Sequence, residues 1–222
     1  MMQAVFLDFY GTVVHEDGEI VQRISQEIAD TGWAASASEV GAYWWAAFQT
    51  EFLSACGDNY VSQRELEIRS LADTIRHFGS SANVDKLSRA MFAHWQKPPL
   101  FPDAREFFAL CPLPIYIVSN IDRADIQEAI RFHALGPSGV FTSEDARAYK
   151  PDRALFEYAL AAVGLAPGDV LHIGDSLTSD VQGAADCGIP ALWLNRGGRA
   201  VPGGVDAADD LLAVLGMLKS LL

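Results

Sequence analysis

The chain has 222 residues, half of which are apolar, and it carries a formal net charge of −13. A chain of this length and composition can bury a full core, which argues against global disorder. Its acidity argues against a nucleic-acid backbone or an anionic membrane as a partner. The three cysteines are far apart, which argues against a disulfide framework and a zinc site. Because the chain shows no secretory leader and no apolar run long enough to span a bilayer, we expect a cytoplasmic protein.

One predicted strand precedes a series of predicted helices. The apolar run at residues 4–8 predicts a buried strand that ends at Asp8. Apolar residues then recur at helical spacing in four stretches with no strand between them, at residues 19–31, 37–55, 62–79 and 84–96. Pro98 and Pro99 end this pattern. We therefore predict that residues 17–97 form a helical bundle inserted after the first strand.

Strands and helices alternate after the two prolines. Strands are predicted at residues 114–118, 140–142, 170–173 and 191–194, and helices at 103–110, 122–133, 151–163, 178–187 and 207–221. Such alternation predicts a doubly wound parallel sheet. The expected fold class is α/β, with a core formed by residues 1–16 and 98–222 and a smaller helical cap formed by residues 17–97.

Polar residues follow the predicted strands or precede the predicted helices at four places. They are Asp8 to Thr12, Ser119-Asn120, Lys150-Pro151, and Gly174-Asp175-Ser176 with the later Asp180. Each segment alone is compatible with an ordinary turn or helix cap. The carboxyl ends of parallel strands, however, lie at one edge of the sheet, where ligands bind. The four segments together therefore indicate a site at that edge.

These residue types suit the chemistry of an anionic substrate. Asp8 and Asp175 are hard oxygen ligands for Mg²⁺, and Asp180 can orient the waters around the metal. The metal would reduce repulsion between the substrate and an attacking carboxylate. Lys150 would keep Asp8 ionised. Three further side chains are expected to donate hydrogen bonds to substrate oxygens, namely Thr12, Ser119 and Asn120.

The four segments resemble the motifs of the haloacid dehalogenase-like hydrolase superfamily. Those motifs are an Asp-x-Asp-x-Thr loop, a Ser or Thr, a Lys, and a Gly-Asp pair with a later Asp. The resemblance spans nearly the whole chain, with residues 17–97 matching a helical cap. It implies that Asp8 is the nucleophile that forms an aspartyl intermediate and that Lys150 assists it. It also implies that Mg²⁺ is bound by Asp8, the backbone carbonyl of Tyr10 and Asp175, with Asp180 nearby.

Tyr10 departs from the phosphatase pattern, because it stands where the second carboxylate serves as the general acid. A phenol, with a pKa of about 10, is a poor proton donor to a departing alkoxide. A Tyr at this position resembles the true haloacid dehalogenases, whose halide leaves without a proton. Those enzymes are metal-free and carry a Ser and an Asn where this chain has Gly174-Asp175.

The expected function is therefore Mg²⁺-dependent removal of phosphate from a small phosphorylated metabolite. A carboxylate at Asp175 would repel both Asp8 and a carboxylate substrate in a metal-free site. A haloacid dehalogenase with Asp8 as nucleophile is the alternative, and a non-catalytic binding protein of the same superfamily is the second alternative. The motifs constrain neither the oligomeric state nor the identity of the substrate.

Other residues have structural interpretations as well as functional ones. Trp44, Phe48 and Phe52 share one face of a predicted helix, which favours the core of the bundle over a lid that faces the substrate. His172 lies inside a predicted strand, which favours a core histidine. Asn195-Arg196 follows the last predicted strand, and both a loop role and an active-site role are open.

Overall fold

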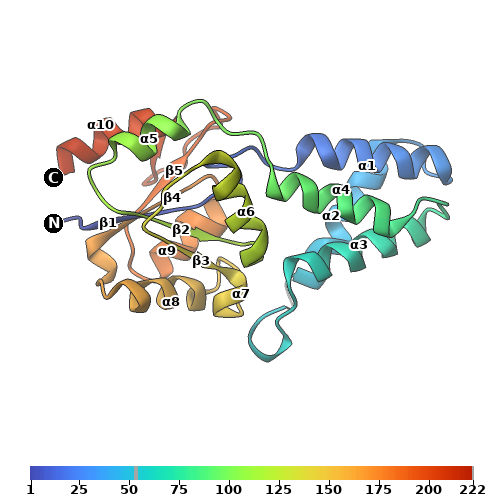
Figure 1. Ribbon diagram of the computed structural model, residues 1–222, viewed down its shortest axis with the longest axis horizontal. Coiled ribbons are helices and arrows are strands. Elements are labelled where there is room, and N and C mark those ends of the chain that lie inside the picture. Colours follow the sequence, from blue (N-terminus) through green and yellow to red (C-terminus); the bar gives the residue numbers. More distant parts are fainter. Residues whose placement is uncertain (53–54, 222) are drawn as a thin grey trace. The chain divides into compact units, whose positions relative to one another are not determined.

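The computed structural model describes residues 1–52 and 55–221, and Figure 1 shows the course of the chain. Two compact units are present. The sheet unit comprises Met1–His15, Pro99–Arg123 and His133–Leu222, and the helical unit comprises Glu16–Pro98 and Ala124–Phe132. The division into a catalytic core and a cap stays a prediction. Among the described residues, every helix is too short or too polar to cross a membrane.

The sheet has six parallel strands in the order β3-β2-β1-β4-β5-β6. The strands are β1 (Ala4–Leu7), β2 (Ile115–Ser119), β3 (Gly139–Thr142), β4 (Val170–Gly174), β5 (Ala191–Leu194) and β6 (Asp206–Ala208). All four residues of β1 are buried, as expected of a central strand in a sheet covered on both faces. The strand order reverses at β1, and this switch point is where ligands bind in such sheets. The predicted doubly wound parallel sheet is confirmed.

Helices cover both faces of the sheet. Figure 1 shows α5 (Ala104–Leu110) and α10 (Leu211–Leu221) on one face, and α8 (Arg153–Val163) and α9 (Gly183–Asp186) on the other. The short helix α7 (Ser143–Ala146) follows β3, the single turn η2 (Pro167–Asp169) precedes β4, and the π-helical turn η3 (Leu177–Gln182) follows β4. Phe6 of β1 belongs to a buried cluster with Leu155 and Phe156 of α8.

Three predicted elements differ from the structure. The helix predicted over 207–221 is wrong at its start, because residues 206–208 pair with β5 as β6 and the helix begins at Leu211. The helix predicted from Pro151 begins at Arg153, since the Asp152 side chain accepts a hydrogen bond from Ala154 N at 2.9 Å and caps the helix there. The segment 178–187 divides into η3 and α9.

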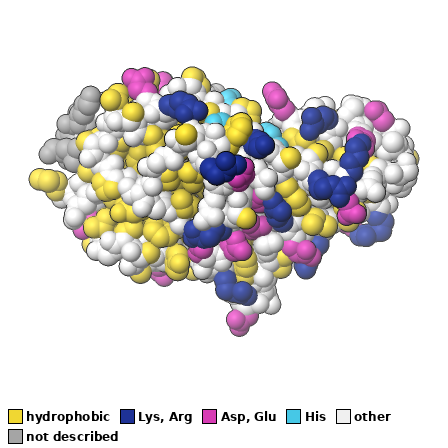
Figure 2. Space-filling model, in the orientation of Figure 1, with side chains coloured by type: hydrophobic (Ala, Val, Ile, Leu, Met, Phe, Trp, Pro, Cys, Tyr) yellow, Lys and Arg dark blue, Asp and Glu magenta, His cyan; other side chains and the backbone are white. Residues whose placement is uncertain are grey.

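The helical unit contains α1 (Gly18–Thr31), α2 (Ala37–Phe52), η1 (Gly57–Asn59), α3 (Gln63–His77), α4 (Val84–Gln96) and most of α6 (Arg123–His133). The helix predicted over 37–55 includes residues 53–54, which lie outside the described residues. Ser62 and Asn83 cap α3 and α4 with their side chains. Acidic and basic side chains are interspersed over the face of this unit seen in Figure 2, as on an ordinary solvated surface.

The aromatic residues of α2 divide into two groups. Trp44 is buried, and its indole nitrogen donates to Ser70 Oγ at 3.2 Å. Phe48 and Phe52 are only half-buried. The Phe48 ring stacks on those of Trp45 and Phe52, with centroid distances of 6.0 and 5.7 Å, and Trp45 is 59% exposed. Trp44 therefore belongs to the core of the helical unit, whereas Phe48 and Phe52 form a partly exposed aromatic row.

Candidate active site

Asp8 lies directly after β1, at the carboxyl edge of the sheet. Its backbone N–H donates to Ile173 O of β4 at 2.9 Å, and the residue is 6% exposed. A tight loop follows, in which the amides of Val13 and Val14 donate to Phe9 O at 2.8 and 3.0 Å. These bonds fold the first motif back on itself directly beyond the strand. The loop therefore presents its groups beside the Asp8 carboxylate.

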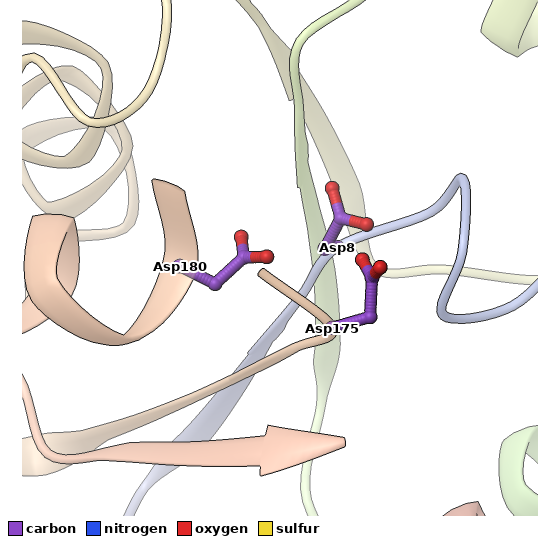
Figure 3. Close-up of side chains that lie close together, drawn as sticks. All are labelled: Asp8, Asp175 and Asp180. Carbon is purple, nitrogen blue, oxygen red and sulfur yellow. The ribbon is translucent and has the colours of Figure 1, made fainter. Parts of the chain in front are cut away.

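Three carboxylates converge at this edge. One oxygen each from Asp8, Asp175 and Asp180 lies within 4.8 Å of the other two. Figure 3 shows the carboxylates of Asp8 and Asp175 facing each other, with Asp180 approaching from η3. Asp175 follows β4 directly, so neighbouring strands β1 and β4 bring the first two carboxylates together. The sequence prediction placed these three residues at one edge, and the structure brings them together.

Gly11 allows the close approach of Asp175 to the first motif. Its φ is +88°, in the region that favours glycine, and an added Cβ would lie 2.6 Å from the Asp175 carboxylate. Any side chain at position 11 would therefore displace Asp175. Gly174 has the same function for Asp180, because a Cβ there would collide with the Asp180 carboxylate. Both glycines keep space for carboxylates.

Lys150 is buried between two of the carboxylates. Its Nζ donates to Asp8 Oδ1 at 2.7 Å, to Asp180 Oδ1 at 2.6 Å and to Val118 O at 2.9 Å. All three ammonium hydrogens therefore have acceptors. Burial lowers the pKa of Lys150, but the carboxylates of Asp180 and Asp8 outweigh burial and hold that pKa above its ordinary value. Lys150 is therefore a permanent positive charge beside Asp8.

The pKa values of Asp8 and Asp180 shift in opposite directions. Burial raises the pKa of Asp8, the ammonium of Lys150 opposes this rise, and the nearby Asp180 adds to it. Burial also acts to raise the pKa of Asp180, but Lys150 and a hydrogen bond from His172 outweigh it and hold that pKa below its ordinary value. Asp8 and Asp180 thus share one ammonium, and a cation bound beside Asp8 and Asp175 would reduce the repulsion between those two carboxylates.

Asn120 and Thr12 have different surroundings from each other. The Asn120 side chain accepts from Lys150 N at 2.7 Å and donates to Lys150 O at 3.0 Å, so both of its polar atoms bind the backbone of Lys150. Asn120 therefore holds Lys150 in place, and its predicted contact with substrate stays a prediction. The Thr12 hydroxyl is buried and has no hydrogen-bond partner among the described residues. Thr12 is thus able to donate to a substrate. Ser119 is buried at the end of β2.

Three further residues contact the backbone of the site, and the sequence had pointed only to Arg196, for which an active-site role was left open. The Trp193 indole and the Arg199 guanidinium donate to Asp175 O at 2.8 and 3.1 Å. Arg196 donates to Thr12 O at 2.8 Å, which ties the loop after β5 to the first motif. Position after a strand was the only available signal for Arg196. No pattern in the sequence pointed to Trp193 or Arg199, because their contacts depend on how the loop after β5 folds.

A divalent cation fits the donor set of this edge. The carboxylates of Asp8 and Asp175 and the backbone carbonyl of Tyr10 are hard oxygen donors, as Mg²⁺ prefers. The close approach of the Asp8 and Asp175 carboxylates favours such an ion. Asp180 is less available, because Lys150 and His172 bind its Oδ1 and the amide of Ser176 binds its Oδ2 at 3.0 Å. Asp180 therefore suits an indirect role.

Known proteins similar to this chain include both a phosphatase and dehalogenases. Residues 2–188 match the family model of the haloacid dehalogenase-like hydrolases. A phosphoserine phosphatase from Thermus thermophilus is 30% identical over 174 residues, which cover 75% of this chain and 68% of the relative. An (S)-2-haloacid dehalogenase from Pseudomonas sp. strain YL is 26% identical over 205 residues, covering 89% and 84%.

Solved structures give the same fold. The structure of an L-2-haloacid dehalogenase from Xanthobacter autotrophicus has a TM-score of 0.79 at 19% identity, and all of each chain is covered. A hydrolase from Bacillus subtilis, solved with bound magnesium, has a TM-score of 0.77 at 18% identity and covers 98% of this chain and 99% of its own. At such identities the likeness establishes the fold.

Proposed function

We propose that this chain, which belongs to the haloacid dehalogenase-like hydrolase family, is a Mg²⁺-dependent hydrolase that removes phosphate from a small phosphorylated compound. The observation that carries the proposal is the position of Asp175. One of its carboxylate oxygens lies within 4.8 Å of one of Asp8, so two acidic groups approach each other where an anionic substrate would bind. A site for an anionic substrate requires a cation to offset this charge.

The reaction follows from the contacts of Asp8. Lys150 holds Asp8 Oδ1 at 2.7 Å, which leaves the other carboxylate oxygen to attack the phosphorus. The new O–P bond forms as the bond to the leaving oxygen breaks, and an aspartyl phosphate results. Water then attacks that phosphorus as the O–P bond to Asp8 breaks, which releases dihydrogen phosphate carrying both water protons and regenerates the Asp8 carboxylate. Lys150 remains protonated throughout, because the neighbouring carboxylates raise its pKa. Its charge stabilises the negative charge that develops nearby.

Other groups of the edge bind and orient the substrate. Asp8, Asp175 and the carbonyl of Tyr10 would hold Mg²⁺, which supplies positive charge toward the phosphoryl oxygens. The Thr12 hydroxyl, which has no partner among the described residues, would donate to one phosphoryl oxygen. Ser119 lies at the end of the adjacent strand β2 and would donate to another. Asn120 acts indirectly by fixing the backbone of Lys150.

Tyr10 defines the class of leaving group. No second carboxylate is present at that position to protonate a departing alkoxide. Loss of general-acid assistance typically lowers a rate about a hundredfold or more. Substrates whose leaving group is stable as an anion, such as an acyl phosphate or an aryl phosphate, do not need this assistance. We therefore expect such compounds to be turned over faster than alkyl monoesters.

The test compares an aryl phosphate with a chlorinated short-chain acid, each with Mg²⁺ and with a chelator. The proposal requires phosphate release that the chelator abolishes and that Mg²⁺ restores. The Asp175→Asn variant should lose this activity as well. Release of chloride that is indifferent to chelator would contradict the proposal. Failure to turn over either compound, while Mg²⁺ fails to bind in calorimetry, would favour a non-catalytic protein.

A haloacid dehalogenase is the second candidate, and Tyr10 is the observation that favours it. A halide leaves without a proton, so a phenol in place of the general acid does not lower the rate of such an enzyme. The similarity to the (S)-2-haloacid dehalogenase also supports this candidate. The Asp175→Asn variant separates the two functions. It should raise chloride release if the chain is a dehalogenase, because a repulsive charge beside Asp8 is lost, and it should lower phosphate release if the chain is a phosphatase.

A further inference from the structure

We propose that His172 is a positioning residue, which holds Asp180 so that Asp180 and Asp8 together fix the ammonium of Lys150. This inference deepens the proposed function, and its activity measurement rests on that function. His172 lies in β4, two strand positions before Gly174, and its side chain is fully buried. Its Nε2 lies 2.9 Å from Asp180 Oδ1. Asp180 Oδ1 in turn lies 2.6 Å from Lys150 Nζ.

The four residues form one continuous chain of hydrogen bonds. The contacts run from His172 to Asp180, from Asp180 to Lys150, and from Lys150 to Asp8, at 2.9, 2.6 and 2.7 Å. Each member is less than one-tenth exposed. Water therefore competes little for these contacts, and charged hydrogen bonds in such surroundings are stronger than at the surface. A substitution at one end of this series of hydrogen bonds should therefore alter the contacts at the other end.

The hydrogen-bonding capacity of the ring fixes the direction of the first contact. The Asp180 oxygen is an acceptor, so His172 Nε2 must donate to it. This donor exists in the neutral Nε2–H tautomer and in the protonated ring alike, so the contact does not depend on the charge of His172. His172 Nδ1 is buried without a partner among the described residues. The ring therefore has a single polar function in this structure, which is to bind Asp180.

Different groups fix the two carboxylate oxygens of Asp180, and His172 is the one that shares Oδ1 with Lys150. The amide of Ser176 binds its Oδ2 at 3.0 Å, and Gly174 provides the space that its carboxylate occupies. The ring of Phe156 meets His172 edge to face, with centroids 5.0 Å apart, and so holds the imidazole in place. Without the His172 donor, Asp180 Oδ1 would keep only Lys150, and the ammonium would be free to shift away from Asp8.

His172→Phe and His172→Gln provide a matched pair of variants. Phe keeps a ring against Phe156 but has no donor, whereas the Gln amide restores an N–H. We expect kcat of His172→Phe to fall about tenfold or more with little change in KM, because a small misplacement of a catalytic group has effects of this size. His172→Gln should recover part of the loss. Leu171→Ala, whose side chain lies on the opposite face of β4, controls for lost core packing and should leave kcat unchanged.

A second measurement needs no substrate. The ring N–H of His172 can be followed by nitrogen-15 NMR in the full chain, in the presence of Asp8→Asn or Lys150→Met. If the hydrogen-bond chain is intact, the resonance shifts in Asp8→Asn and shifts further in Lys150→Met. An unchanged resonance in both variants would overturn the inference, and so would wild-type kcat in His172→Phe or equal losses in the two His172 variants. A shift in a protein that turns over neither test compound and does not bind Mg²⁺ would refute the proposed function and still support the role of His172.

Discussion

The ammonium nitrogen of Lys150 lies 2.7 Å from Oδ1 of Asp8, although the two residues are 142 positions apart in the sequence. Asp8 follows the central strand of the sheet, and Lys150 lies at the end of the segment before α8. Their contact is buried and is shared with Asp180. The nucleophile proposed here therefore owes its environment to one cation and to a second carboxylate that binds the same cation.

Replacement of Asp8 by Asn tests covalent catalysis. Asn keeps the size of the side chain but cannot attack phosphorus, so turnover should fall below detection. The fold should persist, because Asn preserves an oxygen acceptor for Lys150 and removes a buried charge. Turnover with the preferred substrate and thermal unfolding of both proteins provide the two measurements. Full activity in a folded Asp8→Asn protein would rule out the aspartyl intermediate.

Replacement of Tyr10 by Asp tests whether the missing general acid limits the chain. The variant supplies a carboxyl group where a proton donor to the leaving oxygen is needed. Hydrolysis of an alkyl phosphate should rise, by about a hundredfold if proton donation is the only deficit, whereas hydrolysis of an aryl phosphate should change little. Tyr10→Phe is the control, and it should not gain activity toward either ester. An alkyl-phosphate rate that stays at the wild-type level would show that the pocket does not suit such esters.

Replacement of Lys150 by Met should lower both activity and stability. The variant removes the ammonium that the buried carboxylates of Asp8 and Asp180 share, and loss of one partner of a buried ion pair typically costs about 3 kcal/mol or more in the free energy of unfolding. Lys150 helps hold the pKa of Asp180 below its ordinary value, so this stabilisation is present at neutral pH and is lost as the pH falls through the folded pKa of Asp180. Urea unfolding of both proteins should therefore differ most near pH 7.

At lower pH the carboxyls of Lys150→Met take up protons and the difference in stability should narrow. Lys150→Arg keeps the charge and is the control, and it should lose less stability at pH 7. A stability difference that is independent of pH would contradict the assignment of the loss to unpaired carboxylates.

Glu67 provides a pH dependence that is separate from the active site. This side chain of α3 is 5% exposed, and burial together with the nearby Asp17 raises the pKa of Glu67 to about 8. The folded state therefore binds a proton that the unfolded chain releases above its ordinary pKa of about 4.5. The free energy of unfolding should fall by roughly 1.4 kcal/mol per pH unit as the pH rises from about 4.5 to about 8.

Glu67→Gln should remove this slope, because the amide does not titrate. The variant should be more stable than the wild type at pH 8 and similar to it near pH 4.5. Urea unfolding at pH 5, 6.5 and 8 provides the measurement. Glu65→Gln changes a partly exposed glutamate of the same helix and should leave the slope unchanged. Equal slopes in wild type and Glu67→Gln would show that Glu67 does not carry the proton.

The sequence alone was sufficient to predict the parallel sheet and to predict that the polar residues following its strands meet at one edge. Apolar runs alternating with helical patterns predict parallel strands, and the carboxyl ends of parallel strands must meet at one edge. Asp8, Ser119 and Asp175 therefore had to lie near one another. The sequence did not reveal β6, because its short Asp-Ala-Ala segment has no strand periodicity and pairs only through contact with β5.

Tertiary structure alone decided which donor binds which acceptor. Asn120 faces the backbone of Lys150, and His172 reaches Asp180 across the turn that follows β4. Such contacts depend on side-chain packing between segments far apart in the chain, and periodicity contains no information about them. The sequence thus supplied the charged groups and the edge on which they lie. Packing of the strands and loops determined how closely the carboxylates of Asp8 and Asp175 approach each other, which is the physical reason to expect a cation there.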